Sequence, residues 1–108
     1  MQTKENRQKT NQKYYAQNRE KVQAVNQEAR RRIREYVWGL KEQGSCVDCG
    51  VSNPIVLEFD HLPGHEKKGH IASLVSSGYG KATIDAEIAK CELVCANCHK
   101  VRTHERKL

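Results

Sequence analysis

The N-terminal part of the chain carries apolar side chains at three-to-four-residue spacing, the period of one face of an α-helix. We call this set the apolar stripe, and it comprises Val22, Val25, Ala29, Ile33, Tyr36, Val37 and Leu40. From residue 11 to residue 43 the sequence holds no proline and a single glycine near the end, and Gly44 then supplies a stop signal. Because Asn18 could cap a new helix, one long helix and a helix–break–helix both fit the pattern.

Alternation with a period of two follows in residues 55–60, where Ile55, Leu57 and Phe59 fall on one side and Val56, Glu58 and Asp60 on the other. The pattern predicts a strand, entered through Asn53–Pro54 and left through Leu62–Gly64. Further on we expect a short helix at 71–75, a helix at 83–90 capped by Thr83, a strand at 91–94 and a terminal helix at 97–107. This order of elements predicts an α+β fold.

The chain has 108 residues, of which 37% are hydrophobic, too few for a large self-sufficient core. We therefore expect one small domain at 45–108 that needs a covalent or metal staple, preceded by a helical arm at 1–44. No apolar run approaches the length of a signal segment or a membrane span, so we expect no membrane association and a reducing, cytoplasmic setting.

Positive charge is concentrated in the arm. The net charge is +6, with eleven Lys/Arg against five Asp/Glu in residues 1–45 and eight of each in residues 46–108. A segregated basic segment suits a polyanion such as DNA, although a merely solvated helix has the same composition. The candidate DNA-binding residues are Arg30, Arg31, Arg32 and Arg34 on the arm and Lys100 and Arg102 on the terminal helix. The apolar stripe could also pair with a second copy, which would give a homodimer through the N-terminal helix.

Four of the five cysteines form two C-x-x-C pairs, Cys46/Cys49 and Cys95/Cys98. Two such pairs commonly supply four thiolates to one tetrahedral Zn²⁺. Four thiolates close the coordination shell, so we expect this ion to be structural rather than catalytic. We expect the fifth cysteine, Cys91, to be a core residue.

Asp60 and His61 end the first predicted strand, and His99 begins the last helix directly after the second cysteine pair. Because zinc would fix the start of that helix, we expect His99 to meet Asp60 across a two-stranded hairpin. A carboxylate and an imidazole with open positions suit a divalent ion that contacts a phosphate oxygen. His61 would then take a proton from the attacking water, which requires the turn after the strand to re-aim its side chain. The alternative is that Asp60 caps the turn and both histidines are ordinary polar residues.

Three segments together resemble the HNH endonuclease family in its zinc-stapled form, namely residues 46–49, 57–61 and 91–99. The similarity covers about residues 45–105, and the arm is similar to leaders of small bacteriophage HNH proteins. The resemblance implies a ββα-metal (HNH) core stapled by a four-cysteine zinc site, hydrolysis of DNA phosphodiesters with Mg²⁺ or Mn²⁺, and host cytoplasm for a phage-encoded protein. It also implies that Asp60 and His99 hold the catalytic ion and that His61 is the general base.

The sequence departs from the family at the middle Asn, which commonly lies nine residues before the final His, where this chain has Lys90. Asn97 could support the base instead, and Lys90 could contact the scissile phosphate. The alternative function is a non-catalytic zinc-ribbon module that binds nucleic acid, or an accessory that docks on a phage packaging enzyme.

Overall fold

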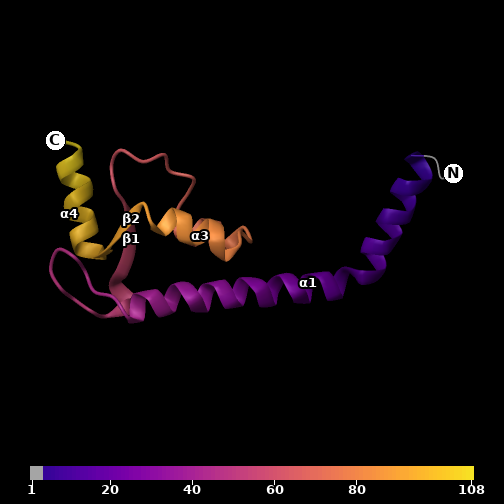
Figure 1. Cartoon of the computed structure of the whole chain (residues 1–108), viewed down its shortest axis with the longest axis horizontal. Coiled ribbons are helices and arrows are strands. Elements are labelled where there is room, and N and C mark those ends of the chain that lie inside the picture. Colours follow the sequence, from indigo (N-terminus) through magenta and orange to yellow (C-terminus); the bar gives the residue numbers. More distant parts are fainter. Residues whose placement is uncertain (1–3) are drawn as a thin grey trace.

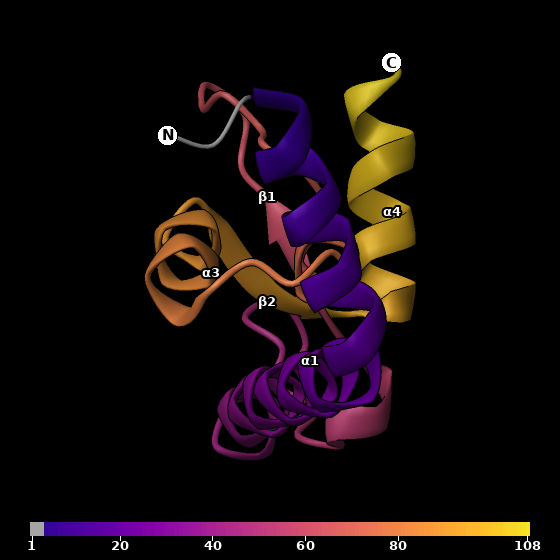
Figure 2. The same ribbon diagram turned by 90° about the vertical axis from the view of Figure 1, so that its right-hand side faces the viewer.

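The computed structural model describes the backbone of residues 4–108 and the side chains of residues 18–108, so the first residues of the predicted arm lie outside the described part. The elements in chain order are α1 (Lys4–Glu42), a 3₁₀ turn (Pro54–Val56), β1 (Leu57–His61), α2 (Ile71–Ser76), α3 (Lys81–Ile88), β2 (Cys91–Cys95) and α4 (Ala96–Arg106). The fold is α+β, as predicted. Figure 1 shows α1 reaching far beyond the rest of the molecule, and both views place α3 and α4 on opposite sides of the hairpin (Figures 1 and 2). No helix among residues 4–108 has the length and apolarity to span a membrane.

α1 is one continuous helix of 39 residues with a bend in its N-terminal part (Figure 1), so of the two alternatives left open by the sequence the long helix is the one observed. Its C-terminal half belongs to the core, because Val37 is buried and Ile33 and Tyr36 pack beside it. The other buried members of this cluster come from α2 and α3: Ile71, Leu74, Val75 and Ile84. The apolar stripe is therefore covered by the chain itself at its C-terminal end, whereas Val22 and Val25 stay exposed.

The strands β1 and β2 form an antiparallel pair with Leu57 opposite Cys95 and His61 opposite Cys91. β1 begins two residues later than predicted because the Asn53 side chain accepts a hydrogen bond from the Ile55 N–H and caps the 3₁₀ turn. The predicted alternation is confirmed, since Leu57 packs into a second buried cluster while Asp60 turns to the other face, toward α4.

Two predicted caps act differently from expectation. α3 begins at Lys81 with Gly80 in the N-cap position, so Thr83 lies within the helix and does not cap it. Gly44 follows the end of α1 without a positive φ, so it is not a left-handed stop. A Cβ at Gly44 would collide with Cδ2 of Leu93. The chain passes closely over β2 at this point, and a larger residue would have to displace the Leu93 side chain.

Candidate functional site

The four cysteines predicted to bind zinc come together at one end of the hairpin. The Sγ atoms of Cys46, Cys49, Cys95 and Cys98 all lie within 4.8 Å of one another, and those of Cys49 and Cys95 are 3.7 Å apart. A disulfide needs about 2.05 Å, whereas a tetrahedral zinc with bonds of about 2.3 Å holds its sulfurs about 3.8 Å apart. The cluster could therefore hold a metal ion, and its geometry and donor chemistry are consistent with structural zinc.

Backbone N–H groups contact two sulfurs of the cluster, whereas the neighbouring sulfur of Cys95, with burial, raises the pKa of the Cys98 thiol. The N–H groups of Cys49 and Cys98 each donate to the sulfur three residues earlier, at 3.4 Å. Burial opposes ionisation of Cys46, but backbone N–H groups, first that of Cys49, lower the pKa of its thiol to about 6. Cys91 lies outside the cluster, packs against the α1–α3 core, and has its pKa raised to about 11 by burial. It is a core residue, as predicted.

Asp60 is buried on the face of β1 that meets α4, with only 2% of its side chain exposed. The two Nη atoms of Arg106 donate to its two carboxylate oxygens at 2.8 Å each, and Nη1 of Arg102 donates to Oδ2 at 2.9 Å. Arg106 outweighs the opposing effect of burial and, together with Arg102, lowers the pKa of Asp60 to about 2. Asp60 is thus an ionised carboxylate neutralised by two guanidinium groups.

Arg102 was predicted to bind DNA, but its guanidinium is held inside the protein. Besides Asp60 it binds Asp48 through two bonds of 2.7 and 2.8 Å and Glu92 at 3.2 Å, and its side chain is 17% exposed. Asp48 lies between the first two cysteines of the cluster. Arg102 therefore ties the cysteine cluster to Asp60 and is not available to a phosphate while these bonds hold.

His99 meets Asp60 across the hairpin, the arrangement expected from the sequence. Its Nε2 lies 3.3 Å from Oδ1 of Asp60, and its Nδ1 lies 2.6 Å from Oε2 of Glu58. Glu58 was missed as a site residue, although its position two residues before Asp60 puts it on the same strand face. Asp60 and His99 are close enough to contact one divalent ion, which commonly takes one or two protein carboxylates and keeps several waters. Arg106 would have to release Oδ1 for this ion.

His61 lies on the opposite face of β1, and the expectation that a turn re-aims it is wrong. The strand continues through His61, which pairs with Cys91, so alternation alone sets its direction. Its Nε2 is buried, has no hydrogen-bond partner in the described part of the chain, and lies 3.5 Å from Oε1 of Glu87. The structure therefore does not put His61 beside Asp60 and His99 on one face of the hairpin.

Glu87 is a buried charged residue that the sequence reading missed. Only 2% of its side chain is exposed, and it accepts bonds from the Lys68 N–H at 2.9 Å and from Nζ of Lys90 at 3.2 Å. The Lys68 N–H outweighs the opposing effect of burial and, with Lys90, lowers the pKa of Glu87. Nζ of Lys90 also donates to the Glu66 carbonyl at 2.7 Å, so this amine is engaged within the protein. The only sequence signal for Glu87 is a charge within an apolar helical pattern.

Asn97 is exposed in the first turn of α4 and lines a shallow hollow with Cys49 and Asn53. His61 sits at the other end of the hairpin, so this placement does not favour the predicted support of His61 by Asn97. Lys100 is exposed on α4, where it is open to a ligand.

The four arginines of the arm differ in their partners. Arg31 and Arg32 form exposed ion pairs with Glu28, and Arg31 also pairs with Glu35. The Nε of Arg30 is buried against the α2–α3 turn and has no hydrogen-bond partner among the described residues. Arg34 has no carboxylate partner within residues 18–108 and lines a groove between α1, β1 and α2. Of the four, Arg34 is therefore the one most open to a phosphate.

Comparisons of the chain with protein-family models, with curated proteins and with solved structures found no match. Membership of the HNH family stays a prediction that depends on the sequence motifs.

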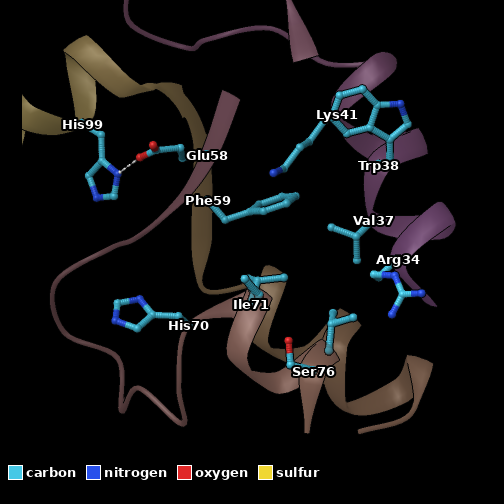
Figure 3. Close-up of a pocket in the computed structure, with 12 residues that line it drawn as sticks. Arg34, Val37, Trp38, Lys41, Glu58, Phe59, His70, Ile71, Ser76 and His99 are labelled. Atoms are coloured by element: carbon cyan, nitrogen blue, oxygen red, sulfur yellow. Dashed lines mark hydrogen bonds and ion pairs between the residues drawn. The ribbon is translucent and has the colours of Figure 1, made fainter. Parts of the chain in front are cut away.

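A groove of about 510 Å³ opens between α1, β1 and α2, and His99 and Glu58 line one end of it (Figure 3). Phe59 and Ile71 lie at its centre, while Trp38, Lys41 and Arg34 approach from α1 (Figure 3). Of these α1 and β1 groove residues, only Arg34 was predicted from the sequence to act in function. The others were not predicted, because residues of α1 and β1 share a surface only once the chain has folded.

Proposed function

We propose that this chain is a small metal-dependent DNA endonuclease whose stapled hairpin carries the cleavage site and whose basic helix binds DNA. The observation that supports this most directly is the meeting of Asp60 and His99, 3.3 Å apart, on the face of the hairpin covered by α4. A carboxylate and an imidazole from separate elements are a donor pair for a divalent ion, and the arm supplies positive charge for a polyanion.

The cysteine cluster is proposed to hold Zn²⁺ as a structural ion. Cys95 and Cys98 flank the start of α4, so zinc would fix the point from which His99 and Arg102 project. With all four positions taken by sulfur, this ion has no place for a substrate. Its contribution is to folding and to the placement of α4 against the hairpin.

The catalytic ion is proposed to bind at Asp60 and His99, with Mg²⁺ or Mn²⁺ as candidates. A divalent ion there supplies a Lewis acid for a scissile phosphate. In this proposal Arg106, which is 36% exposed at the end of α4, gives up its bond to Asp60 Oδ1 when the ion binds. Glu58 accepts the Nδ1–H of His99 and so holds the Nε2 atom toward Asp60.

His61 is proposed as the general base, which requires that its side chain reach the α4 face of the hairpin when DNA binds, because it lies on the opposite face of β1 from Asp60 and His99. Because its Nε2 is buried toward Glu87, Nδ1 is the nitrogen atom proposed to take the proton from water. The Glu87 carboxylate favours a proton on Nε2, which leaves Nδ1 free to accept one. Glu87 is then a positioning residue for His61, the task that the resemblance assigns to the missing middle Asn.

The test is plasmid nicking by the purified chain with added Mg²⁺, with Mn²⁺ and with EDTA. We expect nicking with a divalent ion and none with EDTA. His61→Ala should abolish nicking and leave zinc content and circular dichroism unchanged, whereas His104→Ala, an exposed histidine of α4, should nick like the unchanged chain. Full activity of His61→Ala would sink the assignment of the base.

One observation favours a second candidate, a zinc-stapled module that binds nucleic acid without cutting it. Both oxygens of Asp60 already accept from Arg102 and Arg106, as in a purely structural ion-pair network. In this alternative the hairpin face is a stabilising contact for α4. DNA binding without nicking under every divalent ion would support it over the endonuclease.

A further inference from the structure

The groove of about 510 Å³ between α1, β1 and α2 gathers the aromatic residues best suited to stacking. The chain has one tryptophan and one phenylalanine, and both line this groove. Trp38 is 43% exposed although it is the largest side chain of the molecule, and Phe59 lies opposite it at the centre of the groove (Figure 3). The exposed Trp38 ring offers a flat apolar face to a planar ligand, and Phe59 and Ile71 add apolar lining to the groove beside it.

Positive charge flanks this aromatic surface on α1. Arg34, Trp38 and Lys41 are spaced at i, i+4 and i+7, so they share one face of the helix. Nζ of Lys41 lies 5.7 Å from the centre of the Phe59 ring, and Arg34 has no carboxylate partner within the described residues. Along this helix face an aromatic side chain lies between two cationic ones, and this order matches a nucleotide base with a phosphate on each side.

The end of the groove beside His99 carries negative charge, not positive charge. Glu58 lies there with its carboxylate on His99 (Figure 3) and, in the absence of a divalent ion, repels a phosphate. The charges therefore give a ligand one orientation, with its phosphates on Arg34 and Lys41 and its neutral planar part toward Phe59. They also disfavour an acidic peptide, whose side chains would bring negative charge to both ends of the groove.

We propose that this groove binds an unpaired nucleotide of a DNA strand, with its base stacked on Trp38 above the apolar lining of Phe59 and Ile71 and its flanking phosphates on Arg34 and Lys41. A paired base inside a duplex shows only its edges, so stacking on Trp38 requires a base that is unpaired or displaced from its helix. Because His99 lines the same groove, the preferred substrate of the endonuclease becomes DNA with an unpaired base beside the cut. This last step rests on the proposed function, whereas nucleotide binding by the groove does not.

The single tryptophan makes the binding test direct, since all tryptophan emission comes from Trp38. The zinc-loaded chain without added Mg²⁺ or Mn²⁺ is titrated with a twelve-nucleotide oligothymidine and with a fully paired duplex of equal length. We expect saturable quenching by the single strand and little quenching by the duplex. Unchanged emission at saturating oligothymidine, with binding confirmed by anisotropy of a labelled oligonucleotide, would overturn the proposal. Equal quenching by both ligands would overturn the preference for an unpaired base.

Variants separate stacking from general charge. By anisotropy, Trp38→Ala should weaken oligothymidine binding at least about fivefold and change duplex binding little, because one stacked base contributes about 1–3 kcal/mol. Trp38→Phe keeps an aromatic face and should recover part of the affinity, which also guards against misfolding of the alanine variant. Arg34→Gln should weaken binding more than Arg19→Gln, an equal loss of charge on α1 away from the groove. Equal weakening by the two arginine variants would overturn the assignment of phosphates to this groove.

The binding result and the nicking result can be told apart. Quenching by oligothymidine in a chain that never nicks would leave the groove site standing and refute the endonuclease. Nicking by a chain whose Trp38 emission does not respond to oligothymidine would refute the groove site and leave the endonuclease standing.

Discussion

Replacing Asp60 with asparagine keeps the shape of the side chain but removes the charge shared by Arg102 and Arg106. The carboxylate accepts three hydrogen bonds from these guanidinium groups and is 2% exposed, so solvent screens the interaction little. Lowering its pKa from 3.8 to about 2 corresponds to about 2 kcal/mol of stabilisation. Loss of one partner of a buried ion pair costs about 3–5 kcal/mol, because the remaining charges are left without compensation. We expect Asp60→Asn to lower the free energy of unfolding by about 2–4 kcal/mol.

A double-mutant cycle isolates the part that passes through Arg106. Asp60→Asn, Arg106→Gln and the double variant are unfolded with urea in zinc-containing buffer and followed by circular dichroism. We expect a coupling free energy of about 1.5–3 kcal/mol, the range of hydrogen bonds to charged groups. A coupling below about 0.5 kcal/mol would refute the role of Arg106 as the main partner of Asp60. Glu28→Gln, which removes an exposed ion pair of α1, is the control and should change stability far less.

The pH dependence of the Asp60→Asn effect has a definite sign. The pKa of Asp60 is lowered in the folded protein, so its stabilisation is present above the ordinary pKa and disappears as the pH falls toward 2. The difference in unfolding free energy between the unchanged chain and Asp60→Asn should therefore be constant above about pH 5 and shrink below about pH 4. Acid also protonates zinc-binding thiolates in both proteins, and taking the difference cancels that effect. A difference that grows with acidity would contradict the assignment.

Three further predictions concern the cysteine cluster, the end of α1 and the partner of His61. Cys98→Ser should abolish stoichiometric zinc binding and cooperative unfolding, as should chelation of the metal, whereas Cys91→Ser should keep the zinc measured by elemental analysis. Gly44→Ala should lower the free energy of unfolding by about 1–3 kcal/mol. Gly39→Ala should raise it by about 0.4–1 kcal/mol, because within 4 Å its Cβ would meet no atom of the described residues other than its chain neighbours and the nearby backbone of α1. If the chain nicks DNA, Glu87→Gln should lower kcat about tenfold or more and change KM little, and an unchanged kcat would remove Glu87 from the site.

The sequence predicted those parts of the fold that depend on local periodicity. The helical spacing of the apolar stripe and the alternation of Leu57 with Glu58 are set by 3.6- and two-residue repeats, and both are confirmed. The element ends were less accurate because single side chains decide them: Asn53 caps a 3₁₀ turn where a strand was expected, and Gly80 replaces Thr83 as the cap of α3.

The cysteine cluster was predictable because each C-x-x-C pair is a local turn, and only the meeting of the two pairs required the fold. The partners of the charged residues were not predictable in the same way. Arg102 resembles any basic residue on a helix surface, and only the packing of α4 on the hairpin brings it to Asp48 and Asp60. Glu87 likewise meets His61 because α3 covers the face of β1 opposite α4.

This network gives the cysteine cluster an influence beyond holding the chain together. Asp48, within the first cysteine pair, binds Arg102, which in turn binds the carboxylate that His99 approaches. The start of α4 is set by Cys95 and Cys98, so loss of a metal from the cluster would release both anchors of the helix, the sulfurs and the Asp48 contact. His61 and Glu87 lie on the α3 side of β1 and have neither anchor among their partners. Metal loss should therefore disturb the Asp60–His99 pair before the His61–Glu87 pair, and histidine NMR resonances followed during slow chelation would report that order. Simultaneous changes at His61 and His99 would instead mean that the hairpin unfolds as one unit.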